Sequence, residues 1–250
     1  MTELRLVGLR TIPEIRPGDD LGAMIAEAAA RESLPLEDGD ILVVTQKVVS
    51  KAENQLVDIE TVVPSPFALG IAERFNKDAR RVEVVLRESR RIVRMDRGIL
   101  ITETHHGFIC ANSGVDESNV GGHGVLALLP KDPDASAQRI RETLQALTGK
   151  SVGVIVSDTF GRPWRAGLTD VALGVAGFNP IDDWRGRTDA YGYDLKVTQV
   201  AVADELASAA ELAAGKVSGI PVVVIRGFVP PAGEGSGQSM VRAAADDMFR

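Results

Sequence analysis

Hydrophobic residues recur along the first part of the chain in patterns typical of short strands and amphipathic helices. Residues 4–7 predict a first strand. Residues 21–29 place apolar side chains at the i, i+3, i+4 and i+7 spacing of a helix, and Asp19 and Asp20 precede them as candidate caps. Residues 41–45 are apolar on both faces, so we predict a central strand there.

The same patterns divide the rest of the chain into short elements. We expect helices in a region that begins at Pro64 and Pro66, and over residues 133–148, 204–214 and 239–249. We expect strands over residues 91–93, 98–102, 152–157 and 221–225. Residues 82–87 fit a helix or a strand, and a glycine-rich stretch is expected from 158 to 177. Because the strand spacing is irregular and the loops are long, we predict an α+β fold with mixed sheets, in a single domain over residues 1–250.

The composition excludes several classes of protein. Apolar residues make up 44% of the 250 residues and charged residues 25%, as in ordinary globular proteins. The apolar runs are too short for a membrane helix, and no signal peptide is visible, so we expect a cytoplasmic protein without a membrane partner. The net charge is −7 and no basic stripe occurs, which argues against a nucleic-acid partner.

The single cysteine, Cys110, cannot form an internal disulfide. It lies in the apolar run 108–111, where a buried small hydrophobic residue is favoured over a nucleophile. A reducing compartment is therefore the expected one.

Three short motifs resemble functional sites but fail on context. Residues 148–151 read Thr-Gly-Lys-Ser, yet the first glycine of a P-loop is missing. A P-loop also follows a strand and precedes a helix, whereas here we expect a helix before the motif and a strand after it. Residues 121–124 lack the third glycine of a dinucleotide fingerprint. His105 and His106 are adjacent, so a strand would point them to opposite faces, and no third ligand keeps metal spacing with them.

Two segments combine apolar stretches with polar residues suited to anions or cations. Residues 45–53 carry Lys47 and Lys51, four positions apart at the end of a buried strand, where both could face an anionic ligand; a solvated helix start explains them equally well. Residues 111–120 could form an oxygen-rich loop around Asp116, although an Asx-rich turn is the simpler interpretation.

A third segment, residues 156–165, places Asp158 and Thr159 at the end of a buried strand, with Arg162 and Arg165 just after them. A carboxylate together with a hydroxyl is how hard cations such as Mg²⁺ are held beside nucleotide phosphates. We therefore predict that Asp116 and Asp158, on neighbouring strand ends, form a two-carboxylate cation site.

These segments resemble those of the CofE family, the coenzyme F(420)-0:L-glutamate ligases, which also form the N-terminal half of FbiB proteins. The shared motifs run in the same order along the chain: 16–21, 38–40, 49–53, 114–120, 128–134, 157–162, 189–192, 203–205 and 224–227. The resemblance implies a CofE-like fold, an intertwined homodimer, and a ligase domain without the nitroreductase-like second domain of FbiB.

The resemblance also assigns site residues. It places the guanine nucleotide at Ile12, Pro13, Glu14, Ile15, Gln46, Lys51 and Asn119, and one or two Mg²⁺ or Mn²⁺ ions at Asp116, Asp158 and Thr159, with K⁺ as a further candidate ion. Archaeal members supply another metal carboxylate in a Gly-Glu-Gly stretch, where this chain reads Gly215-Lys216-Val217. A charged lysine cannot ligate a cation, so Lys216 is expected to contact phosphate, and the second metal position stays open.

The implied reaction is phosphoryl transfer from GTP to the terminal carboxylate of F(420)-0, attack of glutamate on the acyl phosphate, and addition of further γ-linked glutamates. Lys51 and Arg162 or Arg165 are the expected catalytic cations. Residues 183–193 are candidates for a substrate surface or for a subunit contact. Two alternatives remain: a ligase acting on another carboxylate such as a folate, and a non-enzymatic GTP-binding protein.

Overall fold

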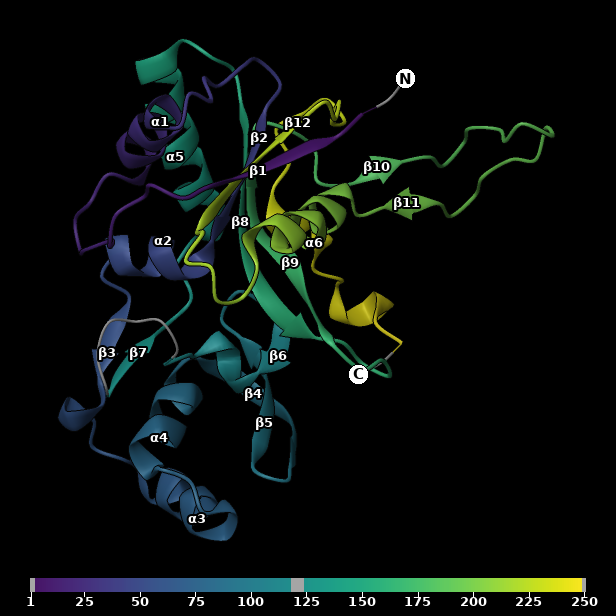
Figure 1. Ribbon diagram of the computed structural model, residues 1–250. Helices are drawn as coiled ribbons and strands as arrows, with labels where there is room; N and C mark the ends of the chain where they lie inside the picture. The colour runs from purple at the N-terminus through teal and green to yellow at the C-terminus, as the bar shows by residue number, and fades with distance from the viewer. Residues whose placement is uncertain (1–2, 118–123, 249–250) are drawn as a thin grey trace.

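A five-stranded mixed sheet forms the centre of the computed structural model, which describes residues 3–117 and 124–248 (Figure 1). Its strands, in spatial order, are β1 (Arg5–Leu9), β12 (Val222–Arg226), β2 (Ile41–Thr45), β8 (Gly153–Gly161) and β9 (Leu168–Ala176). Only β2 and β8 pair in parallel; the other neighbours are antiparallel. The predicted central strand at 41–45 is confirmed.

Helices cover both faces of this sheet. Helices α1 (Leu21–Arg31) and α5 (Pro133–Thr148) pack on one face, and α6 (Val202–Ala214) packs on the other. Successive strand residues point to opposite faces, so Leu42 and Val44 join the first core while Ile41 and Val43 join the second. This double burial explains the unbroken apolar runs of the sequence.

A smaller lobe lies below the edge of the main sheet in Figure 1. It contains α3 (Pro66–Phe75), α4 (Ala79–Arg87), a sheet of β4 (Ser89–Asp96), β5 (Ile99–Thr104) and β6 (Ile109–Ala111), and the pair β3 (Leu56–Asp58) and β7 (Val125–Ala127). The ambiguous residues 82–87 are helical, because Val82 and Val85 face Ile71 and Leu100 in a core of their own. Asp78 caps this helix by accepting a hydrogen bond from the Arg80 amide.

Helix caps predicted from the sequence are confirmed. Asp20 accepts a hydrogen bond from the Ala23 amide at the start of α1. Asp132 does the same for Ala135 at the start of α5, with Pro133 in the first turn, and Gly149 ends α5 in the left-handed conformation.

Two predictions about the second half of the chain are wrong. The glycine-rich stretch from 158 to 177 is largely the long β8–β9 hairpin, whose strands extend well past the end of β2. Residues 239–248 hold no α-helix but two 3₁₀ turns, Gly237–Met240 and Ala244–Asp246. The Asp134 carboxylate accepts hydrogen bonds from the Gly237 amide (2.7 Å) and the Ser236 hydroxyl (2.6 Å), and these contacts hold the segment in a non-helical path.

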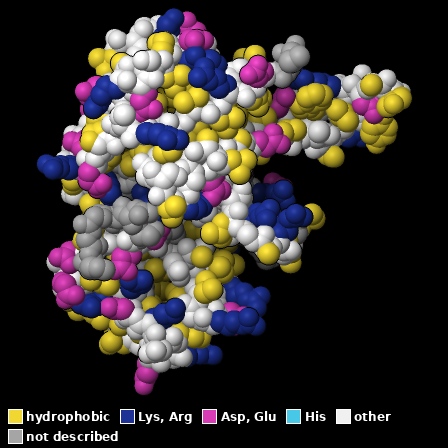
Figure 2. Space-filling model, in the orientation of Figure 1, with side chains coloured by type: hydrophobic (Ala, Val, Ile, Leu, Met, Phe, Trp, Pro, Cys, Tyr) yellow, Lys and Arg dark blue, Asp and Glu magenta, His cyan; other side chains and the backbone are white. Residues whose placement is uncertain are grey.

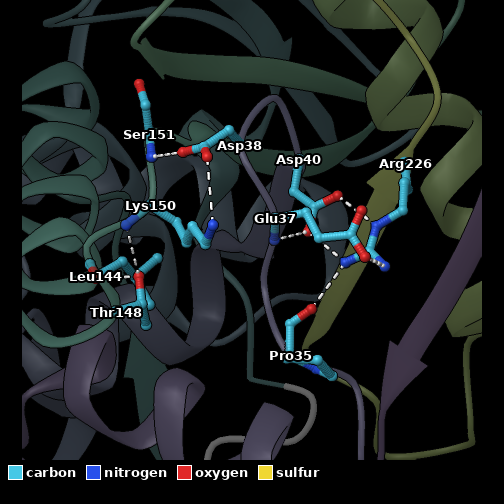
Figure 3. A network of polar contacts seen from close by, with 9 residues as sticks. All are labelled: Pro35, Glu37, Asp38, Asp40, Leu144, Thr148, Lys150, Ser151 and Arg226. Atoms are coloured by element: carbon cyan, nitrogen blue, oxygen red, sulfur yellow. Dashed lines mark hydrogen bonds and ion pairs between the residues drawn. The ribbon is translucent and has the colours of Figure 1, made fainter.

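The turn between α5 and β8 contains the rejected Thr-Gly-Lys-Ser motif (Figure 3). The Lys150 ammonium and the Ser151 amide both contact the Asp38 carboxylate, at 3.3 and 2.8 Å. A helix precedes this motif and a strand follows it, so the rejection of a P-loop is confirmed.

Arg226 at the end of β12 fixes the turn that leads into β2 (Figure 3). Its guanidinium donates to both carboxylate oxygens of Asp40, at 2.8 and 2.7 Å, and to the Pro35 carbonyl at 2.9 Å. It also pairs with Glu37 at 2.5 Å. Asp40 is only 1% exposed, so this ion pair is a buried one.

The fold is α+β, as predicted. Among the described residues, no helix combines the length and the apolar character that crossing a bilayer requires.

Candidate functional site

Polar side chains gather where the parallel strands β2 and β8 lie side by side. Thr45, the last residue of β2, pairs with Ser157 of β8. Helix α2 (Gln46–Ala52) begins directly after Thr45 without connecting residues, while β8 continues through Asp158 and Thr159. Lys47 in the first turn of α2 is therefore brought next to Asp158.

Asp116 reaches the same place from the smaller lobe. Its backbone forms an isolated bridge with Ala127, with hydrogen bonds of 3.1 and 2.7 Å. Its carboxylate forms an ion pair with the Lys47 ammonium at 2.6 Å. The charges of Asp116 and Lys47 also act on the Asp158 carboxylate, so the three groups lie in one neighbourhood.

Asp158 is the most perturbed of these acids. Burial raises its pKa from 3.8 to about 7, and the nearby negative charges of Asp170 and Asp116 add to the effect. The Thr159 amide and the Lys47 ammonium act in the opposite direction without cancelling it. A raised pKa means that the surroundings stabilise the ionised form of this carboxylate poorly. A cation bound beside it would stabilise that form.

Thr159 belongs to a second cluster, on the other face of β8. Its hydroxyl donates to Asp170, the residue opposite it in the β8–β9 pair, at 2.6 Å. It accepts from the Lys216 ammonium, also at 2.6 Å. Lys216 pairs in addition with Asp170 at 3.3 Å and with Glu211 in the last turn of α6. Because adjacent strand residues alternate in direction, Asp158 and Thr159 face different sides of the strand.

The chain can turn sharply enough to bring Lys216 there because of Gly215. This residue ends α6 with a φ of 65°, a conformation that glycine adopts without strain. Helix α6 is itself anchored on β9, since the Ser208 hydroxyl contacts the Thr169 hydroxyl and the Asp170 carbonyl, each at 2.8 Å.

The residues fit a divalent cation. Asp116 and Asp158 lie near one ammonium group, that of Lys47, and Asp170 and Glu211 pair with another, that of Lys216, so one negative charge remains on each face of β8 when Asp158 is ionised. In the part of the chain that is described, no three His, Cys, Asp or Glu side chains form a metal site by themselves. Mg²⁺ ordinarily uses one or two carboxylates and completes its shell with water and substrate phosphates.

The residues assigned to the nucleotide lie beside α2. The Lys51 ammonium, nearly buried, pairs with Glu14 at 2.6 Å. Lys51 follows Lys47 by four residues, so the two side chains leave the same face of α2 about one helical turn apart. The loop after β1 is held there by the hydrogen bond from the Gly18 amide to the Ala52 carbonyl, 2.8 Å long.

Gln46, the first residue of α2, is buried. Its carbonyl oxygen accepts from the Ser50 hydroxyl at 2.8 Å, while its Nε2 has no hydrogen-bond partner among the residues that the structure describes. Ile15 is part of the main core, Ile12 packs against that core, and Pro13 is exposed. Asn119 lies outside the described residues.

The two predicted catalytic arginines, Arg162 and Arg165, follow the end of β8. Both are exposed in the turn that joins β8 to β9. Arg162 donates to the carbonyl of Ala166 at 2.7 Å and so closes its own turn. It lies three residues beyond Thr159, about 10 Å along the strand.

Residues 183–193 lie on an arm that projects from the main body in Figure 1. The short strands β10 (Asp182–Asp183) and β11 (Gln199–Val200) form its base. In Figure 2 the arm stands clear of the body, with hydrophobic side chains along it.

Cys110 is buried, as expected, and the two adjacent histidines both contact the backbone. Burial raises the pKa of Cys110 to about 12, with the Asp158 charge as a second cause, so its thiol stays protonated. The His105 and His106 rings contact backbone carbonyls of Arg87 and Pro130, at 2.8 and 2.9 Å.

Asp170 and Glu211 were missed by the sequence interpretation. Asp170 could have been found only from the register of the β8–β9 pair, which the glycine-rich pattern concealed. Glu211 lies on a correctly predicted helix, but nothing in its spacing indicates which strand that helix covers.

The family model described as "F420-0:Gamma-glutamyl ligase" matches residues 8–227. Three relatives share the name coenzyme F420:L-glutamate ligase. That of Methanothermobacter thermautotrophicus is 46% identical over 99% of both chains. That of Methanocaldococcus jannaschii is 43% identical over 99% of this chain and 97% of its own. That of Methanopyrus kandleri is 47% identical over 95% of this chain and 94% of its own.

Proposed function

This chain belongs to the F420-0:gamma-glutamyl ligase family, and we propose that it joins L-glutamate to the terminal carboxylate of coenzyme F(420)-0 at the expense of GTP. The names of its relatives support the substrates. The convergence of Asp116, Asp158 and Lys47 from three separate segments is the observation that supports a phosphoryl-transfer site.

The proposed reaction has two steps. A carboxylate oxygen of F(420)-0 attacks the γ-phosphorus of GTP, the bond to the β-phosphate oxygen breaks, and an acyl phosphate and GDP result. The glutamate amine then attacks the acyl carbon, inorganic phosphate leaves, and the amine gives up a proton as the amide forms. The same sequence on the new terminal carboxylate would add a γ-linked glutamate.

The proposed role of the protein is to bring anions together. Asp116 and Asp158 would hold Mg²⁺ or Mn²⁺, which supplies charge neutralisation to the nucleotide phosphates when it is bound. Lys51 and Gln46, on α2, would contact the nucleotide. The Lys47 ammonium would reduce the electrostatic repulsion between the carboxylates of Asp116 and Asp158. No side-chain nucleophile is needed, which agrees with the protonated state of Cys110.

The decisive experiment is mass spectrometry of the product from F(420)-0, GTP and glutamate, together with measurement of GDP. We expect the mass of F(420)-0 plus one or more glutamyl units, and one GDP for each unit added. ATP in place of GTP tests nucleotide choice, and folates in place of F(420)-0 test the alternative acceptor. GTP binding without any glutamate-dependent product would support a non-enzymatic GTP-binding protein and refute the ligase proposal.

We also propose that the chain works as a homodimer in the cytoplasm, with the arm as part of the subunit contact. On this arm Tyr191 is 97% exposed, Tyr193 67% and Val197 86%, which is unusual for such side chains in a monomer. Light scattering coupled to gel filtration gives the mass. Removal of residues 187–195 should convert a dimer to a monomer; a monomeric wild type would refute the proposal.

A further inference from the structure

Lys216 occupies a position in which its ammonium group is surrounded by oxygen atoms. Its Nζ contacts the Thr159 hydroxyl at 2.6 Å, the Asp170 carboxylate at 3.3 Å and the Glu211 carboxylate. These partners come from β8, β9 and α6, three different elements. The side chain is still 53% exposed.

The Lys216 ammonium is paired with two carboxylates, those of Asp170 and Glu211. A permanent positive charge is thus fixed on the α6 face of β8, while the pair of Asp116 and Asp158 lies on the α2 face.

The two faces differ in how their carboxylates are paired. On the α6 face, the carboxylates of Asp170 and Glu211 both pair with the same ammonium group, that of Lys216. On the α2 face, Lys47 pairs with Asp116, and among the described residues Asp158 forms no ion pair. The α2 face therefore holds a carboxylate that a divalent ion could bind, whereas the α6 face already holds its cation.

We propose that the Lys216 ammonium is a built-in cation which takes the place of a metal ion on the α6 face, so that this chain binds divalent metal only on the Asp116–Asp158 side. In the reaction, Lys216 would act as a further phosphate-binding cation that is ordered by Asp170 and Glu211 before the substrates arrive. This catalytic role rests on the proposed ligase function, whereas the number of metal ions bound does not.

The first test counts Mn²⁺ ions per chain by electron paramagnetic resonance, without substrates. Lys216→Glu would place a third carboxylate beside Asp170 and Glu211, and we expect it to bind one Mn²⁺ more than the wild type. Lys216→Arg keeps the charge and should bind the same number as the wild type. Lys77→Glu makes the same charge change on an exposed surface of the smaller lobe and should add no ion.

Equal numbers of ions in the wild type and in Lys216→Glu would overturn the proposal, as would two ions already present in the wild type. If circular dichroism shows that Lys216→Glu is unfolded, Lys216→Gln replaces it. This variant frees the oxygens of Thr159, Asp170 and Glu211 without adding charge, and it too should bind one more ion, more weakly.

The second test uses turnover. Lys216→Ala should lower kcat by about 10²-fold or more, as loss of one preorganised charge stabiliser does elsewhere. Added alkylammonium ions should restore part of the rate, because the missing cation is replaced, which a purely structural role for Lys216 would not predict. A fully active Lys216→Ala would overturn the proposal, whereas a wild type that makes no amide would instead refute the proposed function.

Discussion

Asp158→Asn should make the metal-free protein more stable while removing its activity. The folded state raises the pKa of Asp158 above its ordinary value, so folding disfavours the ionised form. Below pH 3.8 the carboxyl is protonated in both states and contributes no penalty. The penalty grows as the pH rises from 3.8 to about 7 and is complete above that value. Asparagine carries no charge at any of these pH values, so the variant avoids the penalty.

The size of the effect follows from the two pKa values. The difference between 3.8 and about 7 corresponds to about 4 kcal/mol in the free energy of unfolding. Asp158 is only half-buried, and solvent reduces the penalty of ionisation, so we expect a gain of about 2 kcal/mol at pH 8.5. At pH 5.5 the gain should be about half as large, because the penalty is still incomplete there.

Urea denaturation in the presence of a chelator measures this gain at both pH values. Asp20→Asn is the control, since asparagine and aspartate cap a helix equally well, and it should change stability little at either pH. Addition of Mg²⁺ should stabilise the wild type and not Asp158→Asn, because a ligand that binds only the folded state raises its stability. A destabilised Asp158→Asn at pH 8.5, or one with normal turnover, would refute the assignment of this carboxylate.

Three further predictions concern other parts of the chain. Arg226→Met should lower the free energy of unfolding by about 3–5 kcal/mol, because it leaves the buried Asp40 carboxylate without its ion-pair partner. Lys150→Met, which breaks an exposed ion pair with Asp38, should lower it by less than about 1 kcal/mol. Urea denaturation of both variants measures which of the two is less stable. Lys51→Met should raise the KM for GTP by roughly tenfold or more through loss of a charge-assisted contact, and an unchanged KM in initial-rate assays would contradict its assignment. The Cys110 thiol, with a pKa of about 12, should resist a thiol reagent at pH 8 in the folded protein and react at once in urea; rapid labelling of the native protein would show that burial does not protect it.

Local signals in the sequence predicted the elements whose residues carry them. The strand at 41–45 and the caps Asp20 and Asp132 were predicted because apolar runs and capping residues act within a few positions of each other. The second strand of the β8–β9 hairpin was missed, because small and glycine residues in 168–176 hide its pattern and its burial is decided by α5 and α6.

Only some residues of the candidate site could be proposed from the sequence. Asp116, Asp158 and Lys51 were proposed because polar residues follow apolar strands, and because the resemblance supplied their roles. The partnership of Lys216 with Asp170 and Glu211 was not predictable, since it depends on the register of a strand pair and on the placement of a helix over it. Arg162 was predicted as a catalytic cation because it follows Asp158 and Thr159 in the sequence, and it lies in the exposed turn that joins β8 to β9.

The direct passage from β2 into α2 has a consequence for the kinetics of substrate capture. A cationic loop would have to become ordered around the incoming phosphates, and that loss of conformational freedom would weaken binding. Here Lys47 and Lys51 extend from a short helix that continues a central strand, so their backbone positions are already set before any encounter. Association with an anionic nucleotide should therefore be limited by diffusion and ionic strength rather than by rearrangement of the protein.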